Sequence, residues 1–175
     1  METERLIMRR WREEDREPFA AMNADPEVME HFPARLTRAE SDGLVDRIEA
    51  QFDRLGYSLW ALEVRGSGEF IGFTGLALQT FEAPFLPAVE IGWRLARPAW
   101  GHGYAIEAAR RATRYAFEEA GLDGIISMTA VPNLRSQAVM RRLGMTRDPA
   151  EDFDHPRVPK DSPLRRHVLY RLSRP

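Results

Sequence analysis

Apolar and polar positions along the chain follow two periods, one typical of strands and one typical of helices. Alternating or continuous apolar runs predict strands over 5–9, 57–64, 70–78, 89–96, 124–131, 144–148 and 164–173. Apolar residues at helical spacing predict helices over 13–22, 26–32, 37–55, 104–120 and 133–143. The sequence contains no internal repeat and no low-complexity tract. We therefore expect one α/β domain over residues 1–175.

Local signals mark several of these boundaries. Thr37 and Glu40 form a capping box that opens the third helix, and Gly56 follows its last turn. Asp25 is a typical N-cap, with Pro26 at the first position of the second helix. The glycine-containing segment 65–69 predicts the turn of a hairpin.

The order of elements also predicts the sheet. Strands 89–96 and 124–131 are joined by the helix 104–120, and this crossover makes them the one parallel pair that the order supports. The crossover helix carries alanine at helical spacing, which lets it lie close to the sheet: Ala105, Ala108, Ala109, Ala112 and Ala116. The prediction is a mixed, mostly antiparallel sheet with flanking helices.

Composition narrows the function classes. Hydrophobic residues make up 43% and charged residues 30% of the chain, which excludes a disordered protein. A net charge of −2 gives no reason to expect nucleic acid or a membrane as a partner. Because cysteine is absent and the four histidines are dispersed, we expect no disulfide, thiol catalysis or metal site. The first residues contain no apolar signal region, so we expect a soluble cytoplasmic protein.

A glycine turn lies between a predicted strand and a predicted helix and consists of Trp100, Gly101, His102, Gly103, Tyr104 and Ala105. This order places unpaired backbone N–H groups at the positive end of a helix, where a phosphate can bind. An isolated motif of this kind is more often a tight turn without a ligand. A dinucleotide fingerprint would need a glycine at Ile106, and a P-loop would need a lysine where the chain has only Lys160.

A downstream segment decides between these alternatives. The strand 124–131 leads into Asn133-x-x-Ser136, at the start of a helix that ends in Leu143-Gly144. With the glycine turn, this order resembles the GCN5-related N-acetyltransferase (GNAT) superfamily, and within it the RimJ/RimL-like branch that acetylates the N-termini of ribosomal proteins. The resemblance extends to the segments 3–9, 25–29, 154–156 and 166–170.

The resemblance implies a GNAT fold in which the parallel strands splay apart, and acetyl-CoA as the acyl donor. The glycine turn matches the pyrophosphate motif Gln/Arg-x-x-Gly-x-Gly/Ala, with Trp100 in place of Gln or Arg. The expected contacts are therefore those of backbone N–H groups from Gly101 to Ala105. Backbone groups of Trp93 and Leu95 are implied to bind the pantetheine amides. Asn133 caps its helix, binds the pantetheine, or does both.

The implied acceptor is a primary amine that attacks the thioester directly in a ternary complex. It belongs to a small molecule or to the N-terminus of a ribosomal or other protein. An α-amino group has a pKa near 8, roughly two units below that of lysine, so it needs only modest help from a base. The protein itself is expected to be a monomer or a homodimer.

Two side chains are candidates for the chemistry. Glu90 points opposite Val89 and Ile91 on its strand, towards a possible cleft, and is the candidate general base; a surface glutamate is the alternative. The resemblance makes Ser136 the candidate partner of the leaving thiolate, and a first-turn helix position is its alternative role. Phe32 and Phe85 fall in segments that border the acceptor cleft in the superfamily.

Three function classes remain at this point. The first is a catalytic acetyl-CoA:amine N-acetyltransferase. The second is a non-catalytic acyl-CoA-binding module that keeps Gly103 and Asn133 without productive chemistry. The third is a different enzyme with a phosphorylated ligand, which the missing lysine and third glycine disfavour.

Overall fold

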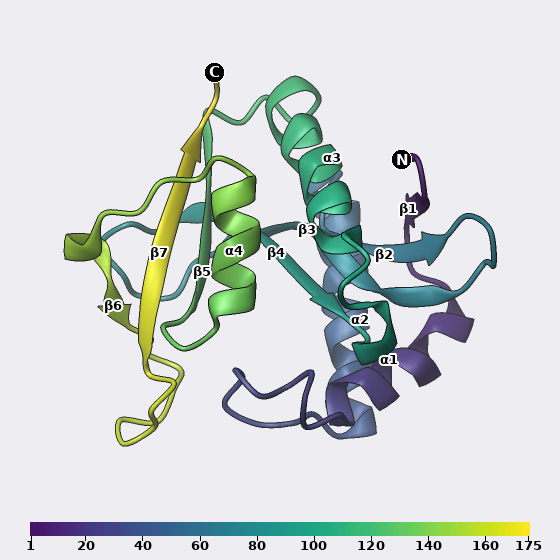
Figure 1. Ribbon diagram of the computed structural model, residues 1–175, viewed down its shortest axis with the longest axis horizontal. Helices are drawn as coiled ribbons and strands as arrows, with labels where there is room; N and C mark the ends of the chain where they lie inside the picture. The colour runs from purple at the N-terminus through teal and green to yellow at the C-terminus, as the bar shows by residue number, and fades with distance from the viewer.

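The computed structural model describes all 175 residues, which form a seven-stranded sheet in the order β1-β2-β3-β4-β5-β7-β6. The strands are β1 Leu6–Arg9, β2 Leu59–Val64, β3 Phe70–Gln79, β4 Ala88–Leu95, β5 Gly124–Ala130, β6 Phe153–Asp154 and β7 Arg166–Ser173. The four α-helices are α1 Arg16–Ala24, α2 Arg38–Leu55, α3 Tyr104–Glu118 and α4 Leu134–Arg142. Figure 1 shows α3 and α4 on the near face of the sheet and α2 on the far face.

The predicted parallel pair is confirmed, and the remaining pairs are antiparallel. β4 and β5 share a single register pair, Glu90 with Ile126, whereas β4 pairs with β3 over its whole length. Beyond that pair the two strands diverge towards their carboxyl ends (Figure 1). The sheet therefore has a gap beside the second half of β4, as the resemblance implied.

Helix boundaries follow the local signals closely. Thr37 accepts a hydrogen bond from the Glu40 N–H, and the Glu40 carboxylate accepts one from the Thr37 N–H, which completes the capping box of α2. Gly56 ends this helix in the left-handed region, at φ 76°. The α3 alanines Ala108, Ala109, Ala112 and Ala116 are fully buried, so the helix lies close to the sheet as predicted. None of the helices combines the length and apolar character that a membrane span requires.

Two predicted elements are wrong. Residues 26–32 form consecutive turns rather than a helix, although Asp25 does accept hydrogen bonds from the N–H groups of Glu27 and Val28. Only six residues separate Pro26 from Pro33, and this length is too short to offset the cost of helix nucleation.

Residues 144–148 form no strand. The segment contributes one isolated bridge, between Thr146 and Arg171, because Gly144 adopts a positive φ and Pro149 soon follows. The two-residue strand β6 and the short 3₁₀ helices Glu13–Asp15, Arg97–Ala99 and Pro149–Glu151 were not predicted.

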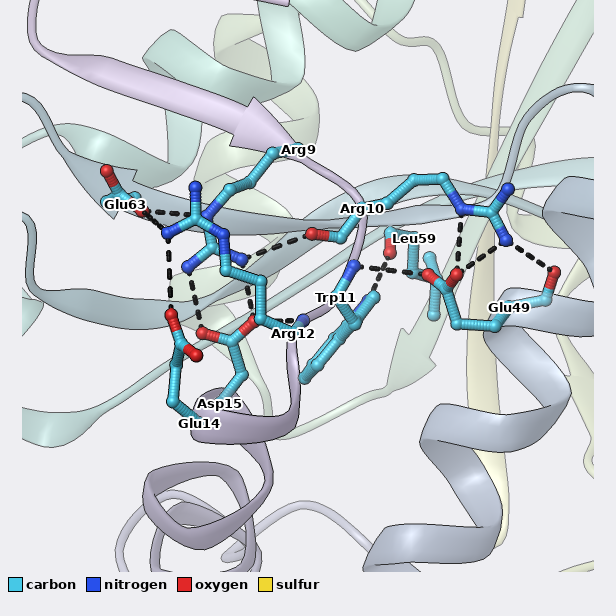
Figure 2. Close-up of polar contacts among 9 residues, drawn as sticks. All are labelled: Arg9, Arg10, Trp11, Arg12, Glu14, Asp15, Glu49, Leu59 and Glu63. Atoms are coloured by element: carbon cyan, nitrogen blue, oxygen red, sulfur yellow. Dashed lines mark hydrogen bonds and ion pairs between the residues drawn. The ribbon is translucent and has the colours of Figure 1, made fainter.

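A network of ion pairs joins the N-terminal segment to the rest of the molecule (Figure 2). Arg9 donates to both oxygens of Asp15, at 2.6 and 2.8 Å, and to Glu63 on β2 at 2.7 Å. The Trp11 indole donates to the Leu59 carbonyl at 2.7 Å. The pairing satisfies a buried Asp15 that has 1% of its surface exposed. β1, the first 3₁₀ helix and β2 are thereby held together by charges that neutralise one another.

Candidate active site

The glycine turn has the backbone geometry of an anion site. Gly101 and Gly103 both adopt left-handed conformations, at φ 82° and 80°. Gly103 is the N-cap of α3, and no side chain caps the helix, so the first N–H groups of α3 have no acceptor within it. A Cβ on Gly101 would meet nothing within 4 Å, and one on Gly103 only an arginine tip at 3.5 Å. Backbone conformation rather than space therefore requires glycine here.

Arg5 and Glu107 connect this turn to the N-terminal segment. Arg5 donates through Nη1 to the His102 carbonyl at 2.9 Å and through Nε to Glu107 at 2.7 Å, while Thr3 donates to the same carboxylate at 2.6 Å. Burial raises the pKa of Glu107, but the hydrogen bonds from Thr3 and Arg5 outweigh it and hold the pKa below its usual value. Glu107 is thus neutralised by the N-terminal segment and does not repel an anion at the turn.

The Trp100 side chain points back towards β4. Its indole N–H donates to the Leu95 carbonyl at 2.8 Å. Arg97 lies over the ring at 4.9 Å, and Arg135 of α4 lies over it at 4.7 Å. A side chain preceding α3 therefore contacts one at the start of α4, across the gap between β4 and β5. His102 and Tyr104 stack on each other with ring centroids 5.5 Å apart.

The second half of β4 presents backbone groups to this gap. The Ala96 N–H donates to the Ile71 carbonyl, which makes Gly72 and Leu95 a non-hydrogen-bonded pair in the β3–β4 ladder. Alternation along the ladder then turns the N–H and C=O groups of Trp93 and Leu95 away from β3. The Leu95 carbonyl accepts the Trp100 indole, and its N–H keeps facing the gap.

Glu90 lies at the point where β4 and β5 separate. Its carboxylate accepts a hydrogen bond from the Gln79 amide at 2.8 Å and one from the Met128 N–H of β5 at 3.3 Å. Burial raises the pKa of Glu90 to about 7, although both hydrogen bonds act to lower it. A carboxyl group with this pKa can accept a proton near neutral pH.

Asn133 and Ser136 lie at the start of α4. Asn133 caps the helix: its side-chain oxygen accepts the Ser136 N–H at 3.1 Å, and its amide donates to Thr129 at 2.9 Å. One amide hydrogen and one oxygen lone pair of Asn133 remain for a ligand. The Ser136 hydroxyl makes no hydrogen bond to the protein and is half-buried. Capping by Asn133 is confirmed, and it leaves the serine hydroxyl unused.

A groove of about 480 Å³ lies beside the glycine turn, on the side of the N-terminal segment. It is lined by Gly103, by acidic and basic residues of segment 2–5, and by three arginines of α3: Arg110, Arg111 and Arg114. Glu90 is not among its lining residues. The groove therefore extends from the glycine turn away from Glu90, and its charges are nearly balanced, with four arginines and three glutamates in its lining.

Two polar residues on the sheet face that carries Glu90 were missed by the sequence analysis. Gln79 is the hydrogen-bond partner of Glu90, and the hairpin register that brings them together is not visible in the sequence. Arg94 lies on the same face of β4 as Glu90 because the two are separated by an even number of residues. That alternation could have identified Arg94 from the sequence.

Comparison with known proteins agrees with this arrangement. The sequence profile of the acetyltransferase (GNAT) domain matches residues 5–146. YkkB of Bacillus subtilis (strain 168) is 31% identical over 144 residues, which cover 82% of this chain and 83% of YkkB. The FsC-acetyl coenzyme A-N(2)-transacetylase of Aspergillus fumigatus is 34% identical over 140 residues, covering 76% of this chain and 59% of that protein.

The fold matches as well. The crystal structure of an acetyltransferase from Agrobacterium tumefaciens str. C58 superimposes with a TM-score of 0.80 at 27% identity, over 99% of this chain and 94% of that one. The matched profile spans the glycine turn, β4, β5 and α4, so it includes every candidate residue discussed above. This chain belongs to the GNAT acetyltransferase family, whose acyl donor is acetyl-CoA.

Proposed function

We propose that the protein is an acetyl-CoA-dependent N-acetyltransferase that moves the acetyl group to a primary amine by direct attack in a ternary complex. The observation that carries the proposal is the position of Glu90. This carboxyl group lies where β4 and β5 separate, and its pKa of about 7 suits a general base. The unpaired edge of β4 runs from Glu90 towards the glycine turn, which follows the carboxyl end of that strand.

The donor would be held largely by backbone groups. The N–H groups from Gly101 to Ala105 would bind its pyrophosphate at the positive end of α3. The gap-facing backbone groups of Trp93 and Leu95 would bind the pantetheine amides as a neighbouring strand would. Asn133, with one amide hydrogen left over, would add a side-chain contact. The fit of the site rests on N–H groups that the protein itself leaves without acceptors.

Proton movement would be divided between two residues. A protonated amine cannot attack a carbonyl, so Glu90 takes a proton from the amine, directly or through a water. The thiolate that leaves needs a proton or a hydrogen bond, and the unused Ser136 hydroxyl at the start of α4 can supply one. Because a serine hydroxyl is a weak acid, a hydrogen bond that orients the sulfur or a water requires less of Ser136 than donating its proton does.

The acceptor class is the finer part of the proposal. An α-amino group is the favoured acceptor, because its low pKa makes it a better match for a carboxylate base than a lysine amine. The Aspergillus relative is named as an acetyl coenzyme A N(2)-transacetylase. A protein N-terminus, including that of a ribosomal protein, remains one source of such an amine, and a small molecule is the other.

The test is release of free thiol from acetyl-CoA with a panel of amines of graded pKa. Glu90→Gln should lower kcat by about 10²–10⁴ while leaving acetyl-CoA affinity unchanged, and the loss should shrink for amines of low pKa. Ser136→Ala should lower kcat by a factor that does not depend on amine pKa, because it acts on the sulfur.

Two outcomes would contradict this assignment. Full activity of Glu90→Gln on a lysine-like amine would show that Glu90 is not the base. Tight binding of acetyl-CoA with no thiol release for any amine would instead favour a non-catalytic acyl-CoA-binding module.

A further inference from the structure

Arg94 is a cation that the protein leaves without a counter-ion. No carboxylate lies within ion-pair distance of it, whereas most other well-enclosed arginines have one. Its one hydrogen bond runs from Nη1 to the Asn23 side-chain oxygen, at 2.5 Å. Burial lowers the pKa of Arg94 to about 10, and no nearby charge opposes that effect. An enclosed positive charge without a partner is costly to the fold, which points to a use.

The free edge of this guanidinium has a specific shape. Nη1 is held by Asn23, and the Nε–Nη2 edge donates to no protein acceptor; Nε is buried and without a partner. Two parallel N–H groups on one edge match the two oxygens of a carboxylate. The ring centroids of Phe32 and Phe73 lie 4.1 and 5.5 Å from the guanidinium carbon, so both rings pack against it.

Phe32 packs against the guanidinium of Arg94. The residue is 36% exposed, so this side of Arg94 lies close to the surface. Residues 26–32 form turns rather than a helix, and displacing the ring breaks no helical ladder.

Arg94 and the proposed base share one face of β4. Residues 90, 92 and 94 alternate with the core-facing Ile91 and Leu95. Gly92 lies between them, and a Cβ there would meet nothing within 4 Å. The position above Gly92, between the proposed base and the unpaired guanidinium, is therefore free of other atoms. At the usual rise of a strand, the Cα atoms of Glu90 and Arg94 are roughly 13 Å apart.

We propose that Arg94 binds a carboxylate of the acceptor, so that the substrate is an amine with a carboxylate several atoms away. This inference rests on the proposed function, because it takes Glu90 as the point where the amine reacts. The amine lies at Glu90, the carbon chain crosses the space above Gly92, and the carboxylate takes the Nε–Nη2 edge of Arg94. A short peptide with a free C-terminus combines this spacing with the α-amino group favoured above. A long ω-amino acid supplies the same spacing, whereas glycine cannot reach both groups.

The first experiment needs no variant. Acetyl transfer is measured for glycine, 4-aminobutanoate, 6-aminohexanoate and 8-aminooctanoate, each against its carboxamide and the matching alkylamine. We expect the carboxylates of the two longest amino acids to be favoured in kcat/KM by roughly 10- to 100-fold, the usual strength of a charge-assisted hydrogen-bonded pair. Glycine should show no such preference. An ω-phosphonate series distinguishes a phosphate-type acceptor, and a preference for it over every carboxylate would overturn the proposal.

The second experiment uses variants. Arg94→Gln should abolish the preference for the carboxylate while changing kcat/KM for the alkylamine less than about threefold, and Arg94→Lys should restore part of it. Arg38→Gln is the matched control, since it removes one arginine that pairs with Asp42 on the exposed surface of α2. Circular dichroism and coenzyme A binding check that each variant is folded.

Direct binding separates this proposal from the proposed function. Binding of 8-aminooctanoate and of its carboxamide is measured calorimetrically on the coenzyme A complex. Carboxylate-dependent binding that Arg94→Gln abolishes supports the role of Arg94 even if no amine is acetylated, an outcome in which only the proposed function fails. Acetylation of alkylamines and ω-amino acids with equal efficiency, unchanged in its ratio by Arg94→Gln, overturns the Arg94 proposal and leaves the proposed function intact.

Discussion

Arg9 on β1 and Arg94 on β4 belong to one sheet, with β2 and β3 between them, and have opposite electrostatic environments. Arg9 donates to Asp15 and Glu63, and the hydrogen bonds with Asp15 above all raise its pKa. Arg94 has only the Asn23 amide oxygen, and burial lowers its pKa. Both guanidinium groups are well enclosed by protein. The difference is whether the chain supplies its own carboxylates.

This contrast distinguishes charged side chains that stabilise the fold from those that remain available to a ligand. The arginine whose donors are satisfied within the chain holds β1, β2 and the first 3₁₀ helix together, and has no edge free for a ligand (Figure 2). The arginine with a free edge is a cost to stability, and that edge remains for a partner from outside. Glu90 belongs with the second kind, because its hydrogen bonds come from neutral groups and not from a cation.

The largest effect should follow from breaking the satisfied network. Asp15→Asn removes the main counter-ion of Arg9 without changing side-chain shape, and should lower the free energy of unfolding by about 3 kcal/mol or more. Denaturant midpoints measure the change. Asp46→Asn, which removes the exposed partner of Arg16, should cost less than about 1 kcal/mol. Equal losses in the two variants would mean that the Arg9 network adds no more than a surface pair.

A second effect concerns the pH dependence of stability. The native pKa of Glu90 is raised from 4.5 to about 7, so between these values the native state binds more protons than the unfolded chain. Stability attributable to Glu90 should therefore be greatest at low pH and fall as pH rises from about 4.5 to about 7. The size of the fall is on the order of 3 kcal/mol for a shift of this magnitude.

The measurement is the difference in unfolding free energy between the native protein and Glu90→Gln across pH 4 to 8. The difference should change over this window and be constant above it. In the same range, kcat/KM should rise with pH, because the deprotonated carboxylate is the active form of a base. A difference that does not vary with pH would mean that Glu90 titrates normally and is well solvated.

The smallest effect should come from Arg94. Arg94→Met removes a charge without a counter-ion, which favours the fold, but leaves the side-chain oxygen of the buried Asn23 without its donor, which opposes it. Because the two effects have opposite signs, the free energy of unfolding should change by less than about 1 kcal/mol in either direction. Thermal and denaturant unfolding of the variant measure this. A loss as large as that of Asp15→Asn would make Arg94 a structural anchor and remove the contrast with Arg9.

The sequence predicted those parts of the fold that local chemistry determines. Each of these signals depends only on residues close together in the sequence, so it can be recognised without knowing the fold. Examples are the capping box of Thr37 and Glu40, the terminating Gly56 and the buried alanines of α3. Residues 26–32 were predicted wrongly because a correct N-cap, Asp25, was followed by too few residues before Pro33. A start signal alone does not show whether a helix can propagate.

The candidate site divides in the same way. The glycine turn, Glu90, Asn133 and Ser136 were found because each carries a local motif or a strand position. Gln79 and Asn23 were not found, because their roles arise from a hairpin register and from helix packing. Whether Arg94 has a counter-ion depends on α1 and on the turns before α2, which lie far away in the sequence.

β4 and β5 share a single register pair, so the sheet consists of two parts, β1-β2-β3-β4 and β5-β7-β6, that are joined at one point of backbone pairing. Beyond that pair, no backbone ladder joins the two parts. Across the gap between β4 and β5, Arg135 lies on the ring of Trp100, a contact typically worth about 0.5–1 kcal/mol at an exposed site. This contact therefore adds little to the attachment of one part of the sheet to the other. Along the second half of β4 the two parts are thus joined by side chains and not by a backbone ladder, which leaves that strand edge open to a ligand lying beside it.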